Sequence, residues 1–539
     1  MQPTPPSATV LPAIVVELIR GARFFALRYE TFVTPAGDLA DITREEVRTF
    51  AGAGVVLAPW HERARGAADA LQTGQVVALD GSWELPLGPG FTRKLSLLLC
   101  REPQRAPVIF LRVSGCFLGW PTAYATPELP ADAIVYAQAL DFVLRAAGAR
   151  PEQWAAMIDW ECSPALLALH GRHRTLLHLQ HIADAWLGEA VASFHFPAGA
   201  GLQRGTALQA ALRVADVVTG ASRGFCDALR REPVYRDLLA AHLQSELTRI
   251  VPLENAHFGA LGADDCALAD ELASDRHHAG MVLAANIAAR RIAYLGNERQ
   301  RFRGAPLILC GGRNTTQHGW DIAIACARRL LETNPNFTAA FWFVMLDGDD
   351  GASRRLAEIA DLERDFPRAI VRSDGSKAEL NRLLAVADLN LCPSLFEPFG
   401  RCYSRTIIPL SSATDGPGSQ IPARRPRGRA AEYHRRWHGD RTPAGWTVFP
   451  EVAQAHESTV NDWKELISGH PVAATNATFR ALVDGYCAAL LEAIDLRSQH
   501  PIEFAAMVCS ALRIQREHSW AQSYQSMIDL MESGCVALA

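Results

Sequence analysis

The chain has 539 residues, of which 49% are hydrophobic and 21% are charged, and its formal net charge is −5. At about 100–200 residues per domain, this length indicates two to four domains, or two large ones, with a core that needs neither disulfides nor metal. The slightly acidic balance argues against a dedicated nucleic-acid-binding protein, and the composition excludes a disordered, collagen-like or coiled-coil chain. A globular enzyme is the remaining expectation.

Membrane and secretion signals are not evident in the sequence. No run of about 18 apolar residues occurs, so no membrane span is predicted. The apolar stretch Val10–Ile19 is interrupted by Glu17 and follows no basic residue, which argues against a secretory signal. The twelve cysteines are scattered without a CxxC pair, which predicts reduced, buried thiols and a cytoplasmic protein. No histidine pair is joined by further cysteines or carboxylates, so no metal site is predicted.

Short apolar runs alternate with stretches of helical periodicity over the first 300 residues. The candidate strands are 23–27, 55–58, 108–111, 175–179 and 217–218. Apolar residues at helical spacing mark 131–147 and 207–215 between them. Such alternation predicts a parallel sheet covered by helices on both faces.

The same alternation begins again beyond residue 300. Strands are predicted at 306–310, 340–346, 369–372 and 389–392, and helices at 321–332 and 378–387. We therefore predict an α/β chain of two Rossmann-like domains joined near 297–304. No internal sequence repeat accompanies the two halves.

Residues 423–446 interrupt this pattern with seven arginines against one aspartate and one glutamate. Their proline, glycine and arginine density is typical of a surface loop. The segment is either a solvated loop or an insertion that binds an anionic or protein partner. No series of aromatic residues accompanies the arginines, so no nucleic-acid partner is predicted.

Two strand-to-loop junctions carry motifs of chemical interest, because ligands of open parallel sheets bind at the carboxyl ends of strands. Gly312–Asp321 (GRNTTQHGWD) follows a strand and combines glycine with an arginine whose planar fork suits a diphosphate. Cys392–Gly400 (CPSLFEPFG) presents Glu397 for sugar hydroxyls, and a helix start beyond Gly400 would attract phosphate. The alternative interpretation of the first motif is an ordinary turn with a surface arginine, and that of the second motif is an ordinary acidic loop.

At these two motifs the chain resembles the bacterial glycogen and starch synthases, which are GT-B glycosyltransferases. Gly312–Asp321 takes the place of the family pattern S-R-L-x-x-Q-K-G-x-D, and Ala387–Gly400 (ADLNLCPSLFEPFG) matches A-D-x-x-x-x-P-S-R-F-E-P-C-G. Weaker similarities extend along most of the chain. In the first half, Phe24–Asp41 resembles an opening strand followed by K-T-G-G-L-A-D, Met157–Trp160 resembles H-A-H-D-W, and Leu176–Ala183 resembles F-T-I-H-N-L-A. Ala215–Ser222 resembles A-D-x-x-x-T-V-S. In the second half, Thr414–Gly416 resembles T-G-G and His518–Trp520 resembles D-F-S-W.

The resemblance implies a GT-B fold, in which two Rossmann-like domains face a cleft and a C-terminal helix crosses back to the first domain. Residues 1–297 would form the N-terminal domain on the acceptor side. Residues 298–515 would bind the nucleotide sugar and carry the Arg-rich insertion 423–446, and 516–539 would form the returning helix.

The resemblance also implies retaining transfer of a sugar, with glucose expected, from an ADP- or UDP-linked donor to a saccharide or other hydroxyl acceptor, without a cofactor or metal. Arg313 would neutralise the leaving diphosphate, and Glu397 would bind the donor sugar. Asp159 and His181 would line the sugar and acceptor side. The predicted donor-binding residues are Gly37, Asp38, Gly312, His318, Phe399, Gly400, Arg401, Thr414, Asp415 and Gly416.

The chain departs from the family pattern at both of its phosphate-binding lysines. Pro35 or Ala36 stands where the first lysine is found, and His318 replaces the second. A charge-assisted hydrogen bond of the kind that each lysine would make to phosphate is worth about 1.5–3 kcal/mol. Arg401 or Arg405 would restore one positive charge, and His318 would supply another only when protonated.

The alignment at the family's active-site histidine leaves two registers open. One places Gln180 on that histidine and His181 on the following asparagine, whereas a shift of one residue gives His181 the place of the histidine. On a strand the choice decides which side chain faces inward. We favour His181.

Two other readings of function stay open at this point. The same fold would suit transfer to a small molecule, a lipid-linked saccharide or a protein, which the changed lysines and the Arg-rich insertion favour. A degenerate member that only binds a glycan or a partner is the other reading, against which the retained Arg313 and Glu397 speak.

Overall fold

A computed structural model provides the structure of the chain. It describes residues 10–34, 39–64, 66–88, 90–118, 128–180, 206–231, 243, 246–253, 255, 263–295, 304–346, 348, 351–373, 375–395, 408–411, 423–424, 445–447, 462, 465–466, 475–517 and 519–533. The chain divides into two compact units. Unit 1 comprises 1–221, 239–258 and 520–539, and unit 2 comprises 222–238 and 259–519.

The sheet of unit 1 has a parallel core with the strand order β10-β9-β8-β7-β1-β2-β6. Every residue of β1, β2 and β7 is buried, as expected for parallel strands covered on both faces. The predicted strands of this half are thereby confirmed. They correspond to β1 (Phe24–Leu27), β2 (Gly54–Pro59), β6 (Val108–Val113), β8 (Arg174–Leu179) and β9 (Val217–Gly220). The strands β7 (Trp154–Ile158) and β10 (Val251–Pro252) have no predicted counterpart.

An antiparallel extension lies at one edge of this sheet and has no counterpart among the predicted strands. β5 (Phe91–Cys100) pairs antiparallel with β6, and both β3 (Val76–Ala78) and β4 (Trp83–Gly88) pair antiparallel with β5. The exposed and buried residues of β4 alternate, which is typical of a strand with one solvated face.

Helices cover the parallel core of unit 1. α4 ends at Gly148, which adopts φ +68°, and a capping box between Thr206 and Gln209 starts α7. The described helices of this unit are α1 (Ala13–Gly21), α2 (Leu39–Thr49), α3 (Ala67–Gln72), α4 (Leu129–Ala147), α5 (Ser163–Leu169), α7 (Ala207–Val214) and α18 (Trp520–Ser533), with 3₁₀ turns at Trp160–Cys162 and Leu247–Arg249.

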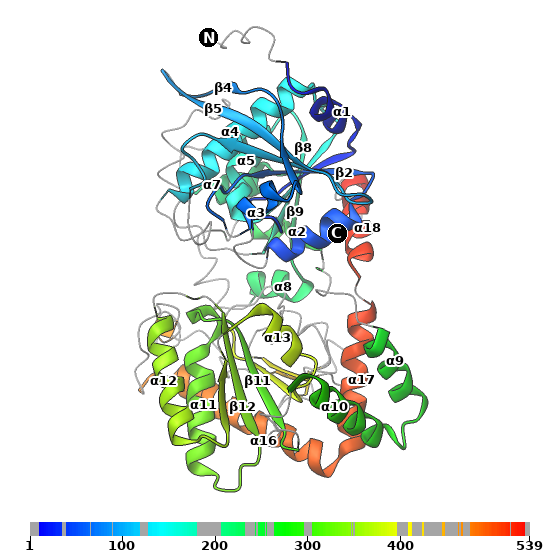
Figure 1. The fold of residues 1–539 in the computed structure, drawn as a ribbon, viewed down its shortest axis with the longest axis vertical. Helices are drawn as coiled ribbons and strands as arrows, with labels where there is room; N and C mark the ends of the chain where they lie inside the picture. The colour runs from blue at the N-terminus through cyan, green and yellow to red at the C-terminus, as the bar shows by residue number, and fades with distance from the viewer. Residues whose placement is uncertain are drawn as a thin grey trace. The chain divides into compact units, whose positions relative to one another are not determined.

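The C-terminal helix α18 belongs to unit 1, which confirms the predicted return of the chain to the first domain. It packs against α2 (Figure 1). Tyr524 lies 5.1 Å from the ring of Phe50 and 6.0 Å from that of Phe24, between ring centroids. Met527 and Met531 enter the same apolar cluster, so the last helix completes the core of the first unit.

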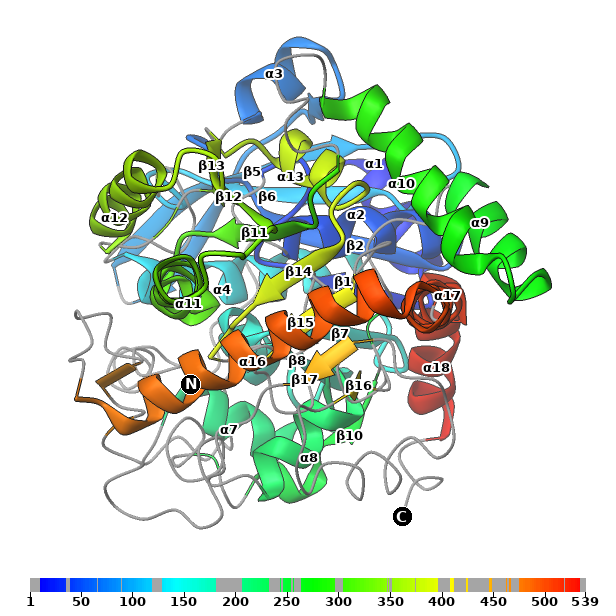
Figure 2. The same ribbon diagram turned by 90° about the horizontal axis from the view of Figure 1, so that it is seen from below.

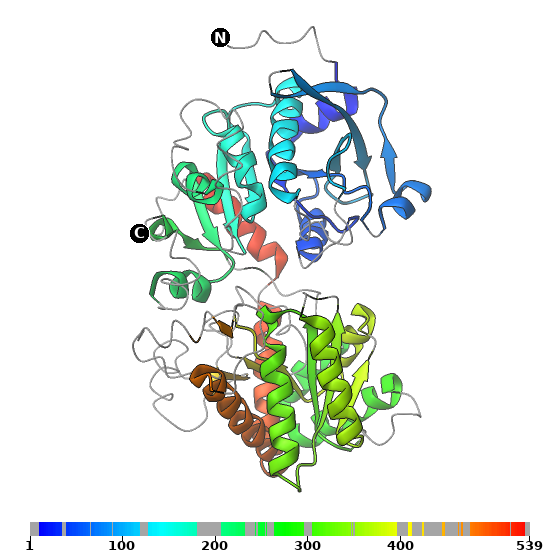
Figure 3. The same ribbon diagram turned by 90° about the vertical axis from the view of Figure 1, so that its left-hand side faces the viewer.

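Unit 2 contains a parallel sheet with the order β13-β12-β11-β14-β15-β17-β16. β11 lies centrally, and α11 and α12 lie side by side (Figure 3, green to yellow-green). The predicted strands of this half are confirmed. They correspond to β11 (Leu307–Arg313), β12 (Ala340–Leu346), β13 (Ile370–Ser373) and β14 (Leu389–Cys392). The strands β15 (Ile408–Ser411), β16 (Ala423–Arg424) and β17 (Gly445–Thr447) have no predicted counterpart, and β16 and β17 lie at the two ends of the segment 423–446, which the sequence pattern predicts to be a surface loop.

The helices of unit 2 include two, at 263–274 and 279–295, that the sequence pattern places in the other half. α9, α10 and α17 pack together (Figure 2), so 259–297 belong with unit 2, whereas the sequence predicts a boundary at 297. The described helices are α8 (Arg223–Arg231), α9 (Ala263–Ser274), α10 (Ala279–Leu295), α11 (Trp320–Thr333), α12 (Ala352–Asp365), α13 (Lys377–Leu383), α16 (Ala477–Gln499) and α17 (Pro501–Glu517), with a 3₁₀ turn at Thr316–His318.

An Ala-Asp pair precedes one strand in each unit and serves the sheet rather than a ligand. Asp216, before β9, accepts a hydrogen bond of 2.7 Å from the backbone N–H of Thr175 at the start of β8. Asp388, before β14, accepts one of 2.7 Å from Leu307 at the start of β11. Asp388 also pairs with Arg291 of α10 and, at 2.6 Å, with Arg497 of α16. Both carboxylates therefore lie at the amino ends of strands.

The described residues contain no helix with the length and apolarity that a membrane span requires. The ten cysteines described are free thiols, seven of them buried, in agreement with the interpretation of cysteine as a small core residue.

Candidate functional site

The first candidate motif lies at the carboxyl end of β11. Gly312 adopts φ +148°, a conformation that favours glycine, and Arg313 is the last residue of the strand. The guanidinium of Arg313 is partly exposed, and its Nε is buried without a hydrogen-bond partner among the described residues. Because buried polar groups are normally paired, this arginine retains capacity for an anionic ligand.

The backbone after Arg313 is fixed by local hydrogen bonds. The carbonyl oxygen of Arg313 accepts hydrogen bonds from Thr315 N at 2.8 Å and from the Trp320 indole Nε1 at 2.6 Å. His318 N donates to Thr315 O at 3.1 Å, which closes a 3₁₀ turn before α11. The turn places the partly exposed His318 five residues beyond Arg313 and one residue before the helix cap Gly319.

The second candidate motif adjoins the first. β14 pairs with β11, with Leu389 beside Ile308. Beyond β14, Leu395 N donates a hydrogen bond of 2.8 Å to Gln317 O. The Cα of Gly319 lies so close to the Pro393 carbonyl that a Cβ at this position would overlap it. The segment that leads to Glu397 therefore starts against the loop that carries Arg313.

Four of the predicted site residues lie among the described residues, namely Asp159, Gly312, Arg313 and His318. The structure brings Gly312, Arg313 and His318 together in one loop of unit 2, and it places Asp159 in unit 1. The other predicted site residues lie outside the described residues. They are Gly37, Asp38, His181, Glu397, Phe399, Gly400, Arg401, Thr414, Asp415 and Gly416, together with most of 423–446.

Asp159 follows β7 and has an unusual backbone. Its φ of +66° and ψ of +175° fall in a region that is almost restricted to glycine. The side chain is fully buried, and Oδ1 accepts a hydrogen bond of 3.3 Å from Gln180 N. The backbone N–H of Asp159 donates to His178 O at 2.9 Å. Strain of this kind persists where the surroundings hold a residue for a specific task.

Asp159 borders a buried polar network at the carboxyl ends of β8 and β9. His178 Nδ1 lies 2.8 Å from Thr219 Oγ1, and its Nε2 lies 2.8 Å from Gln180 Nε2 and 3.0 Å from Asn255 Oδ1. Asn255 Nδ2 donates to Gln180 Oε1 at 2.9 Å. The side chain of Gln180, one of the two residues in the open register, is thus engaged within unit 1.

Burial lowers the pKa of His178 to about 4, against the partial opposing effect of its hydrogen bond to Asn255. The imidazole is therefore neutral near pH 7 and carries one N–H. Nε2 of a neutral ring either donates to Asn255 Oδ1 or accepts from Gln180 Nε2, so the tautomer decides which of these two contacts is a hydrogen bond.

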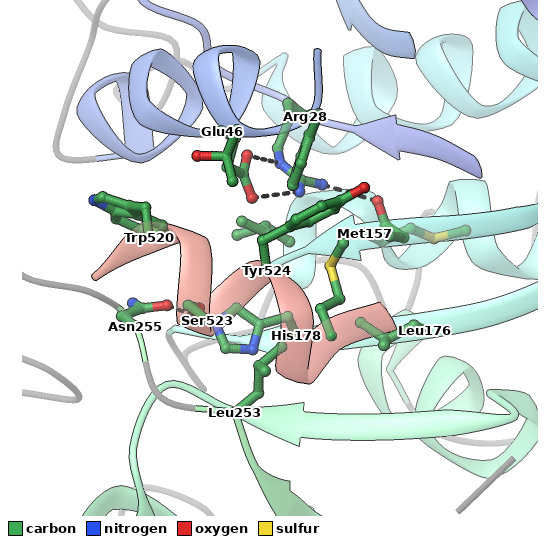
Figure 4. A pocket seen from close by; sticks show the side chains of 15 residues that line it. Arg28, Glu46, Met157, Leu176, His178, Leu253, Asn255, Trp520, Ser523 and Tyr524 are labelled. Atoms are coloured by element: carbon green, nitrogen blue, oxygen red, sulfur yellow. Dashed lines mark hydrogen bonds and ion pairs between the residues drawn. The ribbon is translucent and has the colours of Figure 1, made fainter. Parts of the chain in front are cut away.

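A pocket of about 440 Å³, part of it open solvent, lies beside this network under α18 (Figure 4). Arg28 and Glu46 form a bidentate ion pair in its wall, with N–O distances of 2.6 Å for both contacts. His178 and Asn255 lie on the other side of Tyr524 in this view. Nη1 of Arg28 also donates to the carbonyls of Leu27 and Ala156 at 2.8 Å, so this guanidinium is occupied within the fold.

Several of these residues carry no recognisable signal in the sequence. Asn255 and Gln180 lie 75 positions apart. Arg28 and Glu46 are ordinary charged residues until the fold buries both side chains. Within the described part of the chain, no group of three or more histidine, cysteine or carboxylate side chains is arranged to hold a metal ion.

Comparisons with known proteins identify the fold. No family model matches the chain. A glycogen synthase of Bordetella petrii is 29% identical over 224 residues, which make up 40% of this chain and 40% of that protein. The catalytic domain of starch synthase IV from Arabidopsis thaliana, bound to ADP and acarbose, aligns with a TM-score of 0.68 and 16% identity, covering 95% of this chain and 99% of that one.

A UDP-forming trehalose-phosphate synthase of Burkholderia xenovorans, in complex with glucose-6-phosphate, aligns with a TM-score of 0.51 and 12% identity, covering 95% of this chain and 100% of that one. The chain therefore has the GT-B fold of nucleotide-sugar glycosyltransferases. The predicted fold and the predicted resemblance to glycogen and starch synthases are both confirmed. The matched sequence spans about two fifths of the glycogen synthase.

Proposed function

We propose that the chain is a glycosyltransferase that moves glucose from an ADP- or UDP-linked donor to a saccharide acceptor with retention of anomeric configuration. The motifs Gly312–Asp321 and Ala387–Gly400 support this proposal, as do the GT-B fold and the partial similarity to a glycogen synthase. The matched solved proteins support a nucleotide as the leaving group, because one of them is bound to ADP and another is UDP-forming.

The observation that carries the proposal is the state of Arg313. It ends a central strand of unit 2, where ligands of open parallel sheets bind, and its buried Nε has no hydrogen-bond partner among the described residues. A planar guanidinium binds two phosphate oxygens at once, so Arg313 would stabilise the negative charge that develops on a departing diphosphate.

The other roles follow from the resemblance and remain part of the proposal. Glu397 would bind hydroxyls of the donor sugar, and Phe399, Gly400 and Arg401 would continue that surface. The backbone of Thr414–Gly416 would assist Arg313, and Gly37 and Asp38 would approach the phosphates. Asp159 and His181 would line the sugar and acceptor side, and no metal or other cofactor is required.

His318 is proposed to face the diphosphate in place of the family's lysine. It lies in the 3₁₀ turn that the Arg313 carbonyl helps to close. A histidine supplies a full positive charge only when protonated, so donor affinity should rise as the solution becomes more acidic. The cytoplasm is our proposed compartment, on the ground of the scattered cysteines. The insertion 423–446 is proposed to bind an anionic or protein partner.

The test of the proposal is nucleotide binding by thermal shift, followed by sugar transfer. A ligand at a hundredfold excess over its Kd stabilises the folded state by about 2.7 kcal/mol, which raises Tm. ADP, UDP and their glucose conjugates would be compared for the wild type, Arg313→Ala and Arg372→Ala. Arg372 is a matched control because it lies on β13 of the same sheet and is exposed.

The expected result is a Tm shift with one nucleotide series that Arg313→Ala abolishes and Arg372→Ala retains. The same series should then label a glucan acceptor in a transfer assay. A wild-type protein that binds no nucleotide would contradict the proposal and favour a non-catalytic binding protein. Binding together with transfer only to a non-glucan acceptor would favour the related enzyme class.

A further inference from the structure

The residue after Arg313 is held by the neighbouring helix α12. Asn314 is 1% exposed. Its Nδ2 donates a hydrogen bond of 3.0 Å to Ala352 O, and its Oδ1 accepts one of 3.1 Å from Arg355 Nε. Both partners lie in the first turn of α12, so one amide side chain connects the end of β11 to the start of that helix.

Two glycines make room for this connection. A Cβ on Gly348 would overlap the backbone carbonyl of Asn314, and a Cβ on Gly351 would lie 2.8 Å from Nη2 of Arg355. The guanidinium of Arg355 therefore folds back across the beginning of its own helix. Gly348 and Gly351 therefore pack closely against the pair formed by Asn314 and Arg355.

The pair contains a buried arginine. Arg355 is 0% exposed. A buried arginine is expensive in solvation, and apolar residues of similar volume are often no less stabilising. The family pattern S-R-L-x-x-Q-K-G-x-D has leucine where this chain has Asn314. Core stability by itself does not account for the exchange of leucine for a hydrogen-bonded amide at this position.

α12 also holds the far end of the loop. Arg354 Nη2 donates to Asp321 Oδ1 at 2.7 Å, in the first turn of α11. Two consecutive arginines of one helix thus bond to residues 314 and 321, on either side of the turn that contains His318. The carbonyl of Arg313 is fixed in addition by Trp320 Nε1.

We infer that Arg355 is a positioning residue that acts through Asn314 to aim the Arg313 guanidinium at the ligand. The inference deepens the proposed function and rests on it, because it assigns the support for the arginine that would bind the diphosphate. Arg355 itself would touch no ligand. A fixed Cα–Cβ direction at Arg313 lowers the conformational entropy that the side chain loses on binding phosphate.

The first test follows the loop without any ligand. Hydrogen exchange measured by mass spectrometry on peptides spanning 312–320 would compare the wild type, Arg355→Met and Arg364→Ala. Arg364 is a matched control because it is an exposed arginine of the same helix. Arg355→Met should accelerate exchange of the amides between 314 and 319, and Arg364→Ala should leave it unchanged. Unchanged exchange in Arg355→Met would overturn the inference.

The second test measures ADP and UDP affinity by calorimetry, below the Tm of every variant. Arg355→Met and Asn314→Leu should each weaken nucleotide binding by about tenfold, because each removes a hydrogen bond that involves a charged group. Asn314→Asp keeps the acceptor oxygen for Arg355 but replaces the donor to Ala352 O with a second oxygen, so its affinity should lie between those of Asn314→Leu and the wild type. The double variant Asn314→Leu/Arg355→Met should bind no more weakly than the weaker single variant.

These readouts separate positioning from stability. A purely structural pair would lower Tm and leave the affinity of the folded protein unchanged, which would overturn the inference. Losses that multiply in the double variant would show that Arg355 does not act through Asn314. If the wild type bound neither ADP nor UDP, the proposed function would fail, while the exchange comparison would still decide whether Arg355 holds the loop.

Discussion

The backbone N–H of Leu395 donates a hydrogen bond of 2.8 Å to the carbonyl oxygen of Gln317. This bond joins the two motifs that stand 75 residues apart in the sequence, one with Arg313 and the other with Glu397. It is possible because Gly319, at φ +67°, leaves space for the Pro393 carbonyl. The close approach of two backbones therefore depends on a single missing side chain.

Gly319→Ala should destabilise the protein by about 2 kcal/mol or more, because the new methyl group overlaps a carbonyl and alanine disfavours a positive φ. Urea unfolding would measure the change. Gly304→Ala is the control, since Gly304 has nothing within 4 Å of its ideal Cβ, and it should stay within about 0.5 kcal/mol of wild type. Equal stability of the two variants would contradict the role assigned to Gly319.

Asp159→Gly should be more stable than Asp159→Ala by about 1–2 kcal/mol, because only glycine adopts φ +66° and ψ +175° without strain. Both variants lack the carboxylate, so the difference between their stabilities reports only the cost of the backbone conformation. The same pair of substitutions at Asp69, an exposed residue of α3, should show the opposite order, because alanine is the better helix former. Thermal or urea unfolding of the four variants would measure both differences.

Glu46→Ala should cost about 3–5 kcal/mol of unfolding free energy, because it leaves the Arg28 guanidinium buried without its carboxylate. The exposed pair Arg23–Glu532 provides the comparison, and Arg23→Ala should cost at most about 1 kcal/mol. Replacing both buried partners, as Arg28→Met/Glu46→Leu, should recover part of the loss. If Glu46→Ala lowered the unfolding free energy by less than Arg23→Ala does, other groups would have to compensate the buried charge of Arg28.

Lowering the pH should destabilise the protein through His178. Its pKa is about 4 in the folded protein, against 6.5 for an unperturbed histidine, so the unfolded chain binds a proton that the folded one excludes. The stabilising effect of the neutral state is complete above pH 6.5 and is lost as the pH falls towards 4. Between pH 7 and pH 5 this group contributes about 2 kcal/mol of lost stability.

The variant His178→Gln should show a shallower fall in urea-unfolding free energy between pH 7 and pH 5 than the wild type. Other groups also contribute to the wild-type slope, among them His173, whose pKa is lowered by burial. His61, with a pKa of about 4, acts in the same direction, whereas Asp132, with a pKa raised by burial to about 6, opposes it. These groups remain in the variant, so the difference between the two slopes belongs to His178. Identical slopes would contradict its neutral state.

Part of the parallel core of each unit could be predicted, because strands such as β2 and β14 are buried throughout. The sequence prediction of 340–346 agrees with β12, and that of 389–392 agrees with β14. The antiparallel β4 could not, because its alternating exposure leaves no continuous apolar run. The sequence pattern assigns α9 and α10 to the first half, since their attachment to α17 depends on contacts more than 200 positions apart, such as the ion pair of Asp270 with Arg516.

The candidate site was predictable only in part. Arg313 and Gly312 could be recognised because a strand end, a glycine and a guanidinium are adjacent in the chain. The Ala-Asp pairs look equally characteristic in the sequence, yet they brace the amino ends of strands, as Asp388 shows. Glu397 and His181 remain predictions, because they lie outside the described residues.

The sequence by itself determined the alternation of strands and helices, the two halves and the glycine-arginine loop, because each of these depends on neighbours within about ten residues. Tertiary structure alone decided which polar side chains became buried partners. Asn314 meets Arg355 across 41 positions, and His178 meets Asn255 across 77. Such pairs form because whole helices and strands pack together. A hydrogen bond between residues so far apart in the sequence produces no periodic pattern of residue types that could predict it.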